Sequence, residues 1–154
     1  MFDTPQLAAG LFIAPEISIS IFGFLLNFIW EIWQVPLFQS MDNLTYFEAT
    51  IGCTRAALGD VVILLVAFWI IALTARSRSW IIHPTTIQVT GFIAIGIVIT
   101  VVVEAISIHV LNRWQYATAM PTLPILGTGI TPILQWLMIP PIIVFMKLRR
   151  GIDV

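Results

Sequence analysis

Four long hydrophobic segments, separated by shorter polar stretches, dominate the chain. They cover about residues 17–38, 57–75, 87–111 and 127–146. Roughly 20 apolar residues let a helix cross a membrane, because each advances about 1.5 Å through about 30 Å of hydrocarbon. The pattern therefore predicts an all-α protein in which a single domain, residues 1–154, forms an integral membrane four-helix bundle.

The only extended polar stretch is 39–58. Its apolar residues recur at helical spacing: Leu44, Phe47, Ile51 and Leu58. This spacing predicts a short amphipathic helix lying on the membrane surface. We therefore expect the second span to begin only near residue 57, after that helix.

The basic residues are distributed unequally between the two sides of such a bundle. One side carries Arg76, Arg78, Lys147, Arg149 and Arg150, and the other carries only Arg55 and Arg113. Positive charge is enriched on the cytoplasmic side of membrane proteins. We therefore expect both termini and the 76–85 turn in the cytoplasm, and the 39–58 and 112–126 loops on the outer side.

The composition agrees with a membrane protein and excludes several functions. Hydrophobic residues make up 59% of the chain and charged residues 10%, whereas soluble domains average about 25% charged. The net charge of −1 and the lack of a basic stripe argue against a nucleic-acid partner. The single cysteine, Cys53, excludes an internal disulfide and a multi-cysteine metal site. We predict no metal site, and no motif identifies a cofactor.

Three acidic residues interrupt the hydrophobic segments: Glu31, Asp60 and Glu104. A charged carboxylate inside a membrane costs roughly 2.5 kcal/mol or more. At about 1.5 Å per residue, the three lie roughly 7, 12 and 9 Å from the centres of their spans, all toward the outer face. We therefore expect them to meet in one layer of the outer leaflet, as candidate catalytic acids or bases.

Helical spacing adds polar neighbours to this layer. The polar faces are formed by Asn27, Glu31 and Gln34; by Thr100, Glu104 and Ser107; and by Gly127, Thr131 and Gln135. Polar faces of membrane helices turn toward the bundle interior. The sequence thus predicts a polar pocket in the outer half of the bundle, closed below by apolar residues.

The candidate binding residues come from these faces and from the outer loops. They are Asn27, Gln34, Arg55, His109, Arg113, Trp114, Tyr116 and Gln135. Arg55 or Arg113 would hold an anionic head group, and Tyr116 would donate a hydrogen bond. His109 lies about 140° around the helix from Glu104, so it is either a ligand or base, or a histidine at the membrane interface.

Structural roles for the acids remain open. Glu31 and Glu104 are either functional or neutral acids that join helices through hydrogen bonds to amide side chains. Pairing with Arg55 or Arg113 is a further alternative. Asp60, beside Gly59, is either part of the layer or a helix N-cap.

Three segments, 27–38, 54–60 and 113–136, resemble a group of small four-helix bacterial inner-membrane proteins that have no established activity. The resemblance implies a multi-pass protein of the bacterial inner, cytoplasmic membrane. Two shorter matches, Trp30-Glu31 and Trp114-Gln115-Tyr116, are similar to small membrane-embedded carotenoid cyclase subunits. That similarity implies protonation chemistry on an isoprenoid.

Two functions fit these observations. The first is binding or transformation of a lipid-soluble small molecule by the outer-leaflet carboxylates, and whether the protein is an enzyme stays open. The alternative is an accessory or structural subunit of a larger membrane complex. Besides the lipid bilayer and a hydrophobic ligand, the partners that fit are a second copy of the chain, as a homodimer, or such a complex. Gly91 and Gly96 favour the alternative, because small residues allow close contact with another helix.

Overall fold

The computed structural model describes residues 14–41, 43–124 and 127–152. Its four long helices are α2 (Pro15–Gln34), α3 (Tyr46–Ala75), α4 (Thr86–His109) and α5 (Ile130–Ile152). Short 3-10 helices are η1 (Val35–Leu37), η2 (Gln39–Met41) and η3 (Arg78–Ile81). Each of the four long helices includes a segment long and apolar enough to cross a membrane. The prediction of an all-α protein with four helices able to span a membrane is therefore confirmed.

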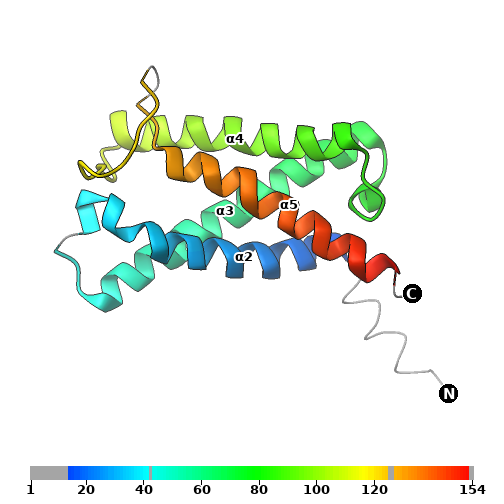
Figure 1. The fold of residues 1–154 in the computed structure, drawn as a ribbon, viewed down its shortest axis with the longest axis horizontal. Helices are drawn as coiled ribbons and strands as arrows, with labels where there is room; N and C mark the ends of the chain where they lie inside the picture. Colours follow the sequence, from blue (N-terminus) through cyan, green and yellow to red (C-terminus); the bar gives the residue numbers. More distant parts are fainter. Residues whose placement is uncertain (1–13, 42, 125–126, 153–154) are drawn as a thin grey trace.

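The helices cross rather than run parallel. In Figure 1, α2 and α4 lie along opposite edges, while α5 crosses in front of them and α3 crosses behind on the opposite diagonal. Each of α3 and α5 packs against both α2 and α4. We call the end with η1, η2 and residues 110–124 and 127–129 the loop end. The other end, with the start of α2, η3 and the end of α5, is the termini end.

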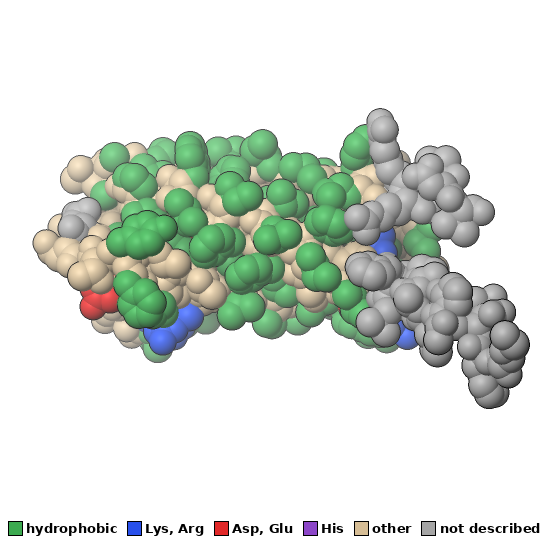
Figure 2. All heavy atoms as spheres, turned by 90° about the horizontal axis from the view of Figure 1, so that it is seen from below, with side chains coloured by type: hydrophobic (Ala, Val, Ile, Leu, Met, Phe, Trp, Pro, Cys, Tyr) green, Lys and Arg blue, Asp and Glu red, His purple; other side chains and the backbone are tan. Residues whose placement is uncertain are grey.

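Apolar side chains cover the outside of the bundle between its two ends. Figure 2 shows hydrophobic side chains along the middle of one face, with acidic and basic side chains only toward the ends. Exposed apolar residues occur on all four helices, including Ile29, Leu73, Val98 and Leu137. This distribution is the one expected of a surface that contacts lipid.

The second membrane helix begins earlier than the sequence predicted. Thr45 caps α3: its side chain accepts a hydrogen bond from the Glu48 backbone N–H, and its own N–H donates to Glu48 Oε2 at 2.9 Å. This reciprocal cap starts a helix that continues without a break to Ala75. Residues 46–58 are thus the first part of α3 and not a separate helix, and Asp60 is not an N-cap.

Gly96 allows α4 and α5 to approach closely. A Cβ atom at this position would lie 1.8 Å from Trp136 Cζ3, and Trp136 is itself buried. A Cβ at Gly91 would lie 3.0 Å from Ile71 of α3. Both glycines therefore serve contacts within this chain, and the close packing that the sequence suggested for a partner helix is internal.

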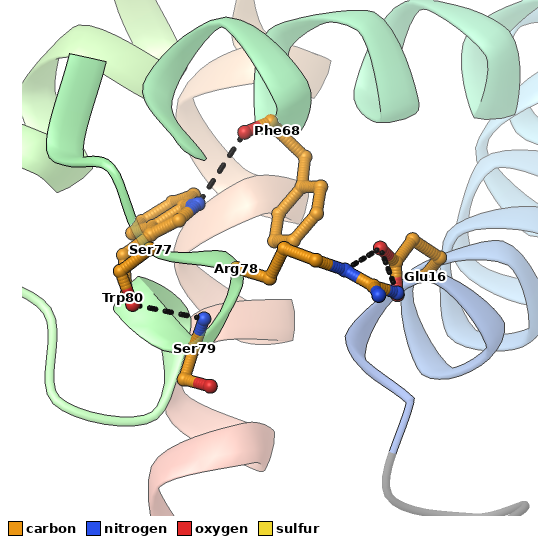
Figure 3. Close-up of polar contacts among 6 residues, drawn as sticks. All are labelled: Glu16, Phe68, Ser77, Arg78, Ser79 and Trp80. Carbon is orange, nitrogen blue, oxygen red and sulfur yellow. Dashed lines mark hydrogen bonds and ion pairs between the residues drawn. The ribbon is translucent and has the colours of Figure 1, made fainter. Parts of the chain in front are cut away.

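An ion pair and an aromatic cluster close the termini end. Arg78 of η3 donates to Glu16 Oε1 from Nη2 at 2.8 Å and from Nε at 3.1 Å (Figure 3). The Trp80 indole N–H donates to the Phe68 carbonyl at 3.3 Å, and the Trp80 ring also contacts Phe92. The connection between α3 and α4 is thereby fixed against the bundle.

Candidate functional site

Gln135 joins three helices near the loop end. Its Nε2 donates to Asn27 Oδ1 at 2.7 Å and to Asp60 Oδ2 at 2.8 Å. Asn27 in turn donates from Nδ2 to the Gly23 carbonyl at 2.7 Å. Gln135 and Asn27 are each 3% exposed, so this chain of bonds crosses the interior from α5 to α2 and α3.

Glu31 lies beside this network, one turn along α2 from Asn27. Its Oε1 accepts a hydrogen bond from Gln34 Nε2 at 2.8 Å. The carboxylate also lies within Coulombic range of Asp60, Glu104 and the Cys53 thiol. Acidic side chains from α2, α3 and α4 therefore meet at one level of the bundle. We call Glu31, Asp60 and Glu104 the carboxylate layer.

The third acid is held by the loop that follows α4. Glu104 Oε2 accepts hydrogen bonds from the Tyr116 hydroxyl and, at 3.4 Å, from Trp114 Nε1. The Gly129 backbone N–H donates to the Tyr116 oxygen at 2.9 Å. Burial, and then the hydrogen bond to Glu104, raise the pKa of the Tyr116 phenol. The phenol therefore remains a neutral donor to this carboxylate.

Backbone hydrogen bonds set the position of that loop. The Gln39 N–H donates to the Gln115 carbonyl at 3.0 Å, and the Ala117 N–H donates to the Leu37 carbonyl at 2.9 Å. Tyr116 thus lies between two bonds to the segment that follows α2, and its ring contacts Phe38. The two segments predicted to lie on the outer side are therefore joined directly above the carboxylate layer.

The polar helix faces turn inward. Gln34, Thr100, Ser107 and Thr131 are buried together with Asn27, Glu104 and Gln135, while Glu31 and Asp60 are half-buried. Two atoms of these side chains, Gln34 Oε1 and Thr100 Oγ1, lack a hydrogen-bond partner among the described residues, as does Trp30 Nε1 next to Glu31 in the sequence. The polar side chains around the carboxylate layer are thus mostly buried, and some of their hydrogen-bonding atoms have no partner among the described residues.

The basic candidates do not enter this layer. Arg55, Arg113 and His109 are exposed. In the part of the chain that the structure describes, neither arginine forms an ion pair with the three acids. The alternative in which Arg55 or Arg113 neutralises Glu31 or Glu104 is therefore not observed, and the partners of the acids are amides, a phenol and an indole.

An apolar groove of about 270 Å³ lies beside the layer, between α2 and α5. Its lining residues are Leu26, Ile29, Trp30, Trp33, Met138, Ile139 and Ile142. On α5, the groove residues follow Gln135 at i+3, i+4 and i+7, so they continue the same helix face. The groove thus begins one turn from the side chain that bonds Asn27 and Asp60.

The groove was not predicted from the sequence. The pattern indicated a polar pocket, whereas most polar groups are bonded to one another and the open volume is apolar. Trp30 and Trp33, whose ring centroids are 5.4 Å apart, were not among the candidate binding residues. The spacing of Met138, Ile139 and Ile142 from Gln135 is the one signal in the sequence that points to this surface.

Among residues 14–41, 43–124 and 127–152, no group of three His, Cys, Asp or Glu side chains is arranged to hold a metal ion. Comparison with protein-family models, with curated proteins and with solved structures finds no match. The resemblances drawn from short segments are therefore not supported by these comparisons. The function has to be argued from the layer and the groove alone.

Proposed function

We propose that this protein binds a lipid-soluble small molecule in the groove between α2 and α5, with the carboxylate layer as the polar partner behind it. The observation that carries the proposal is the juxtaposition of the two features along α5, where Gln135 and the groove residues share one face. Ligand sites are concave and mainly apolar, with a few convergent polar groups. Acidic residues within membrane spans commonly mark functional sites.

The orientation of the site follows from the basic residues. Arg76 and Arg78 lie at the termini end, and α5 carries Arg149 and Arg150 to the same end. On the positive-inside rule this end faces the cytoplasm, as do both termini. The carboxylate layer and the groove then lie in the outer leaflet of the membrane, which we propose is a bacterial inner membrane.

Acid–base chemistry is the second part of the proposal. Glu31 and Glu104 are partly screened from water, and amide or phenol donors hold both carboxylates. Such groups are able to give or take a proton from a bound molecule. If the bound molecule is transformed, Glu31→Gln or Glu104→Gln should abolish turnover while the amide side chain keeps the hydrogen bond.

Native mass spectrometry of the protein in mild detergent, after exposure to a membrane lipid extract, tests the binding function. We expect a retained lipophilic molecule, lost in Ile142→Trp because the larger ring fills the groove. Val98→Trp on α4, at a position 62% exposed to the bundle exterior, is the matched control and should retain it. Absence of any bound molecule from the wild type, or equal retention by both variants, would overturn the proposal.

No specific observation favours the alternative, an accessory or structural subunit. The glycines that suggested an external helix contact instead approach Ile71 and Trp136 of the same chain. The exposed apolar side chains surround the whole bundle, as lipid contact alone requires. Co-purification with a large membrane complex would revive this alternative.

A further inference from the structure

The charges around the groove restrict what it can bind. The carboxylate layer contributes three acidic groups, and Arg55 and Arg113 are exposed and bonded to none of them. His109, at the loop end of α4, is also exposed, and Lys147 lies at the termini end of α5. Inside a bilayer, the field of any of these acids that is ionised would be weakly screened.

One uncharged polar group near the layer, the Gln34 amide, would also favour a cation. Gln34 is 3% exposed and its Nε2 donates to Glu31, which leaves its carbonyl Oε1 buried with no hydrogen-bond partner in the described chain. That oxygen is the negative end of the amide dipole. A positive charge nearby would satisfy it and would favour the ionised form of the carboxylates.

The groove wall suits a cation that needs no hydrogen bonds. Trp30 and Trp33 form a tilted ring pair, with centroids 5.4 Å apart, and both line the groove. Indole faces are the best aromatic partners for ammonium groups. The remaining lining residues are aliphatic or Met138, and they fit a hydrocarbon body.

From this charge complementarity we propose that the occupant of the groove is a lipophilic organic cation, such as an alkyl quaternary ammonium. The inference rests on the proposed function, since it names the ligand class of the same groove. Its hydrocarbon part lies on Leu26, Ile139 and Ile142. Its positive charge lies against the tryptophan faces, with the carboxylate layer as counter-charge. An anionic head group, which the sequence suggested for Arg55 or Arg113, is disfavoured here.

Three probes with one hydrocarbon chain test this inference. They are decyltrimethylammonium, its uncharged analogue with a quaternary carbon in place of nitrogen, and decanesulfonate. Equilibrium dialysis against the protein in lipid nanodiscs, with empty nanodiscs subtracted, measures protein-dependent binding below micellar concentrations. We expect the cation to bind about tenfold or more tightly than the uncharged analogue, and the sulfonate to show no protein-dependent binding.

Variants show whether the preference for the cation depends on the carboxylate layer and on the tryptophan rings. Glu31→Gln and Asp60→Asn should each reduce the preference for the cation several-fold, because each removes a counter-charge. Glu16→Gln, on the same helix as Glu31 but at the termini end, is the control and should leave the preference unchanged. Trp33→Leu should weaken cation binding about threefold or more, beyond its effect on the uncharged analogue.

The outcomes separate the inference from the function on which it rests. Equal binding of the cation and its uncharged analogue, or preferred binding of the sulfonate, would overturn the cation assignment and leave a lipophile-binding groove. No protein-dependent binding of any probe, together with no effect of Ile142→Trp, would overturn both.

Discussion

Acidic side chains have different partners at the two ends of the bundle. At the termini end, Glu16 is paired with Arg78, whose side chain is 63% exposed. At the loop end, Glu31, Asp60 and Glu104 lie near one another without a basic partner among the described residues. Proximity to water explains the first arrangement, because an exposed ion pair is cheap to form and worth little. This reason does not explain the loop end, where the acids have no basic partner among the described residues.

Uncharged donors hold the acids of the loop end. Gln135, Gln34 and Tyr116 each donate to one carboxylate. A basic residue buried in the layer would neutralise it and fix its charge. Amide and phenol donors satisfy carboxylate oxygens without doing so. Among the described residues, the three acids of the loop end thus have hydrogen-bond donors but no counter-charge, whereas the acid of the termini end has one.

The largest effect is expected where α4 and α5 cross between the two ends. Gly96→Ala would place a Cβ 1.8 Å from the buried Trp136 ring and should destabilise the protein by about 3 kcal/mol through overpacking. Gly59→Ala is the matched control in α3, with nothing within 4 Å of its added Cβ. It should be neutral or stabilising by about 0.5 kcal/mol. Equilibrium unfolding in detergent measures both, and equal effects would contradict the crossing.

The next largest effect is expected from Gln135, whose side chain joins α5 to α2 and α3 at the loop end. Gln135→Leu removes both hydrogen bonds and leaves Asn27 Oδ1 and Asp60 Oδ2 without that donor, which should cost about 2 kcal/mol. The same unfolding assay measures it. Asn27→Ala should lower stability by less, since Gln135 keeps its bond to Asp60. Wild-type stability of Gln135→Leu would mean that the network is not formed.

Removing the phenol should have a smaller effect that depends on pH. Tyr116→Phe loses the bonds to Glu104 and from Gly129, and should cost about 1 kcal/mol at neutral pH. The pKa of Tyr116 is raised in the folded protein. Its contribution is therefore fully present below the unfolded value of about 10 and is lost as the pH rises through the folded pKa. The stability difference between wild type and variant should stay constant up to about pH 10, and a loss near neutral pH would contradict this.

The smallest effect is expected from the ion pair of the termini end. Arg78→Leu removes the bonds to Glu16 and the contact with the Trp69 ring, at 5.3 Å from its centroid. Since Arg78 is mostly exposed, the loss should be about 0.5 kcal/mol and should shrink at high salt. A loss as large as that of Gln135→Leu would remove the difference between the two ends.

The sequence predicted the features that depend on periodicity. Four apolar runs specify four helices, and i, i+4, i+7 spacing places Asn27, Glu31 and Gln34 on one inward face. Depth counting also predicted that the three acids share a layer. Each of these follows from local geometry within one helix.

The features that depend on tertiary contacts were not predictable. The early start of α3 depends on the Thr45–Glu48 cap, which a search for apolar runs does not detect. The groove lies between α2 and α5, and no pattern within a single helix encodes how two helices pack. Arg55 and Arg113 are near the layer in sequence, yet their side chains face outward.

The substitution Gln135→Lys shows whether the three acids of the loop end lack a counter-charge. In Gln135→Lys the ammonium group would lie where Nε2 now donates to Asp60, among carboxylates with no other counter-charge. We predict that its stability in equilibrium unfolding equals or exceeds that of the wild type, while Gln135→Leu and the groove-facing Met138→Lys are both less stable. If Gln135→Lys unfolds more easily than Gln135→Leu, the layer is not an unneutralised group of acids, and the account of the loop end is wrong.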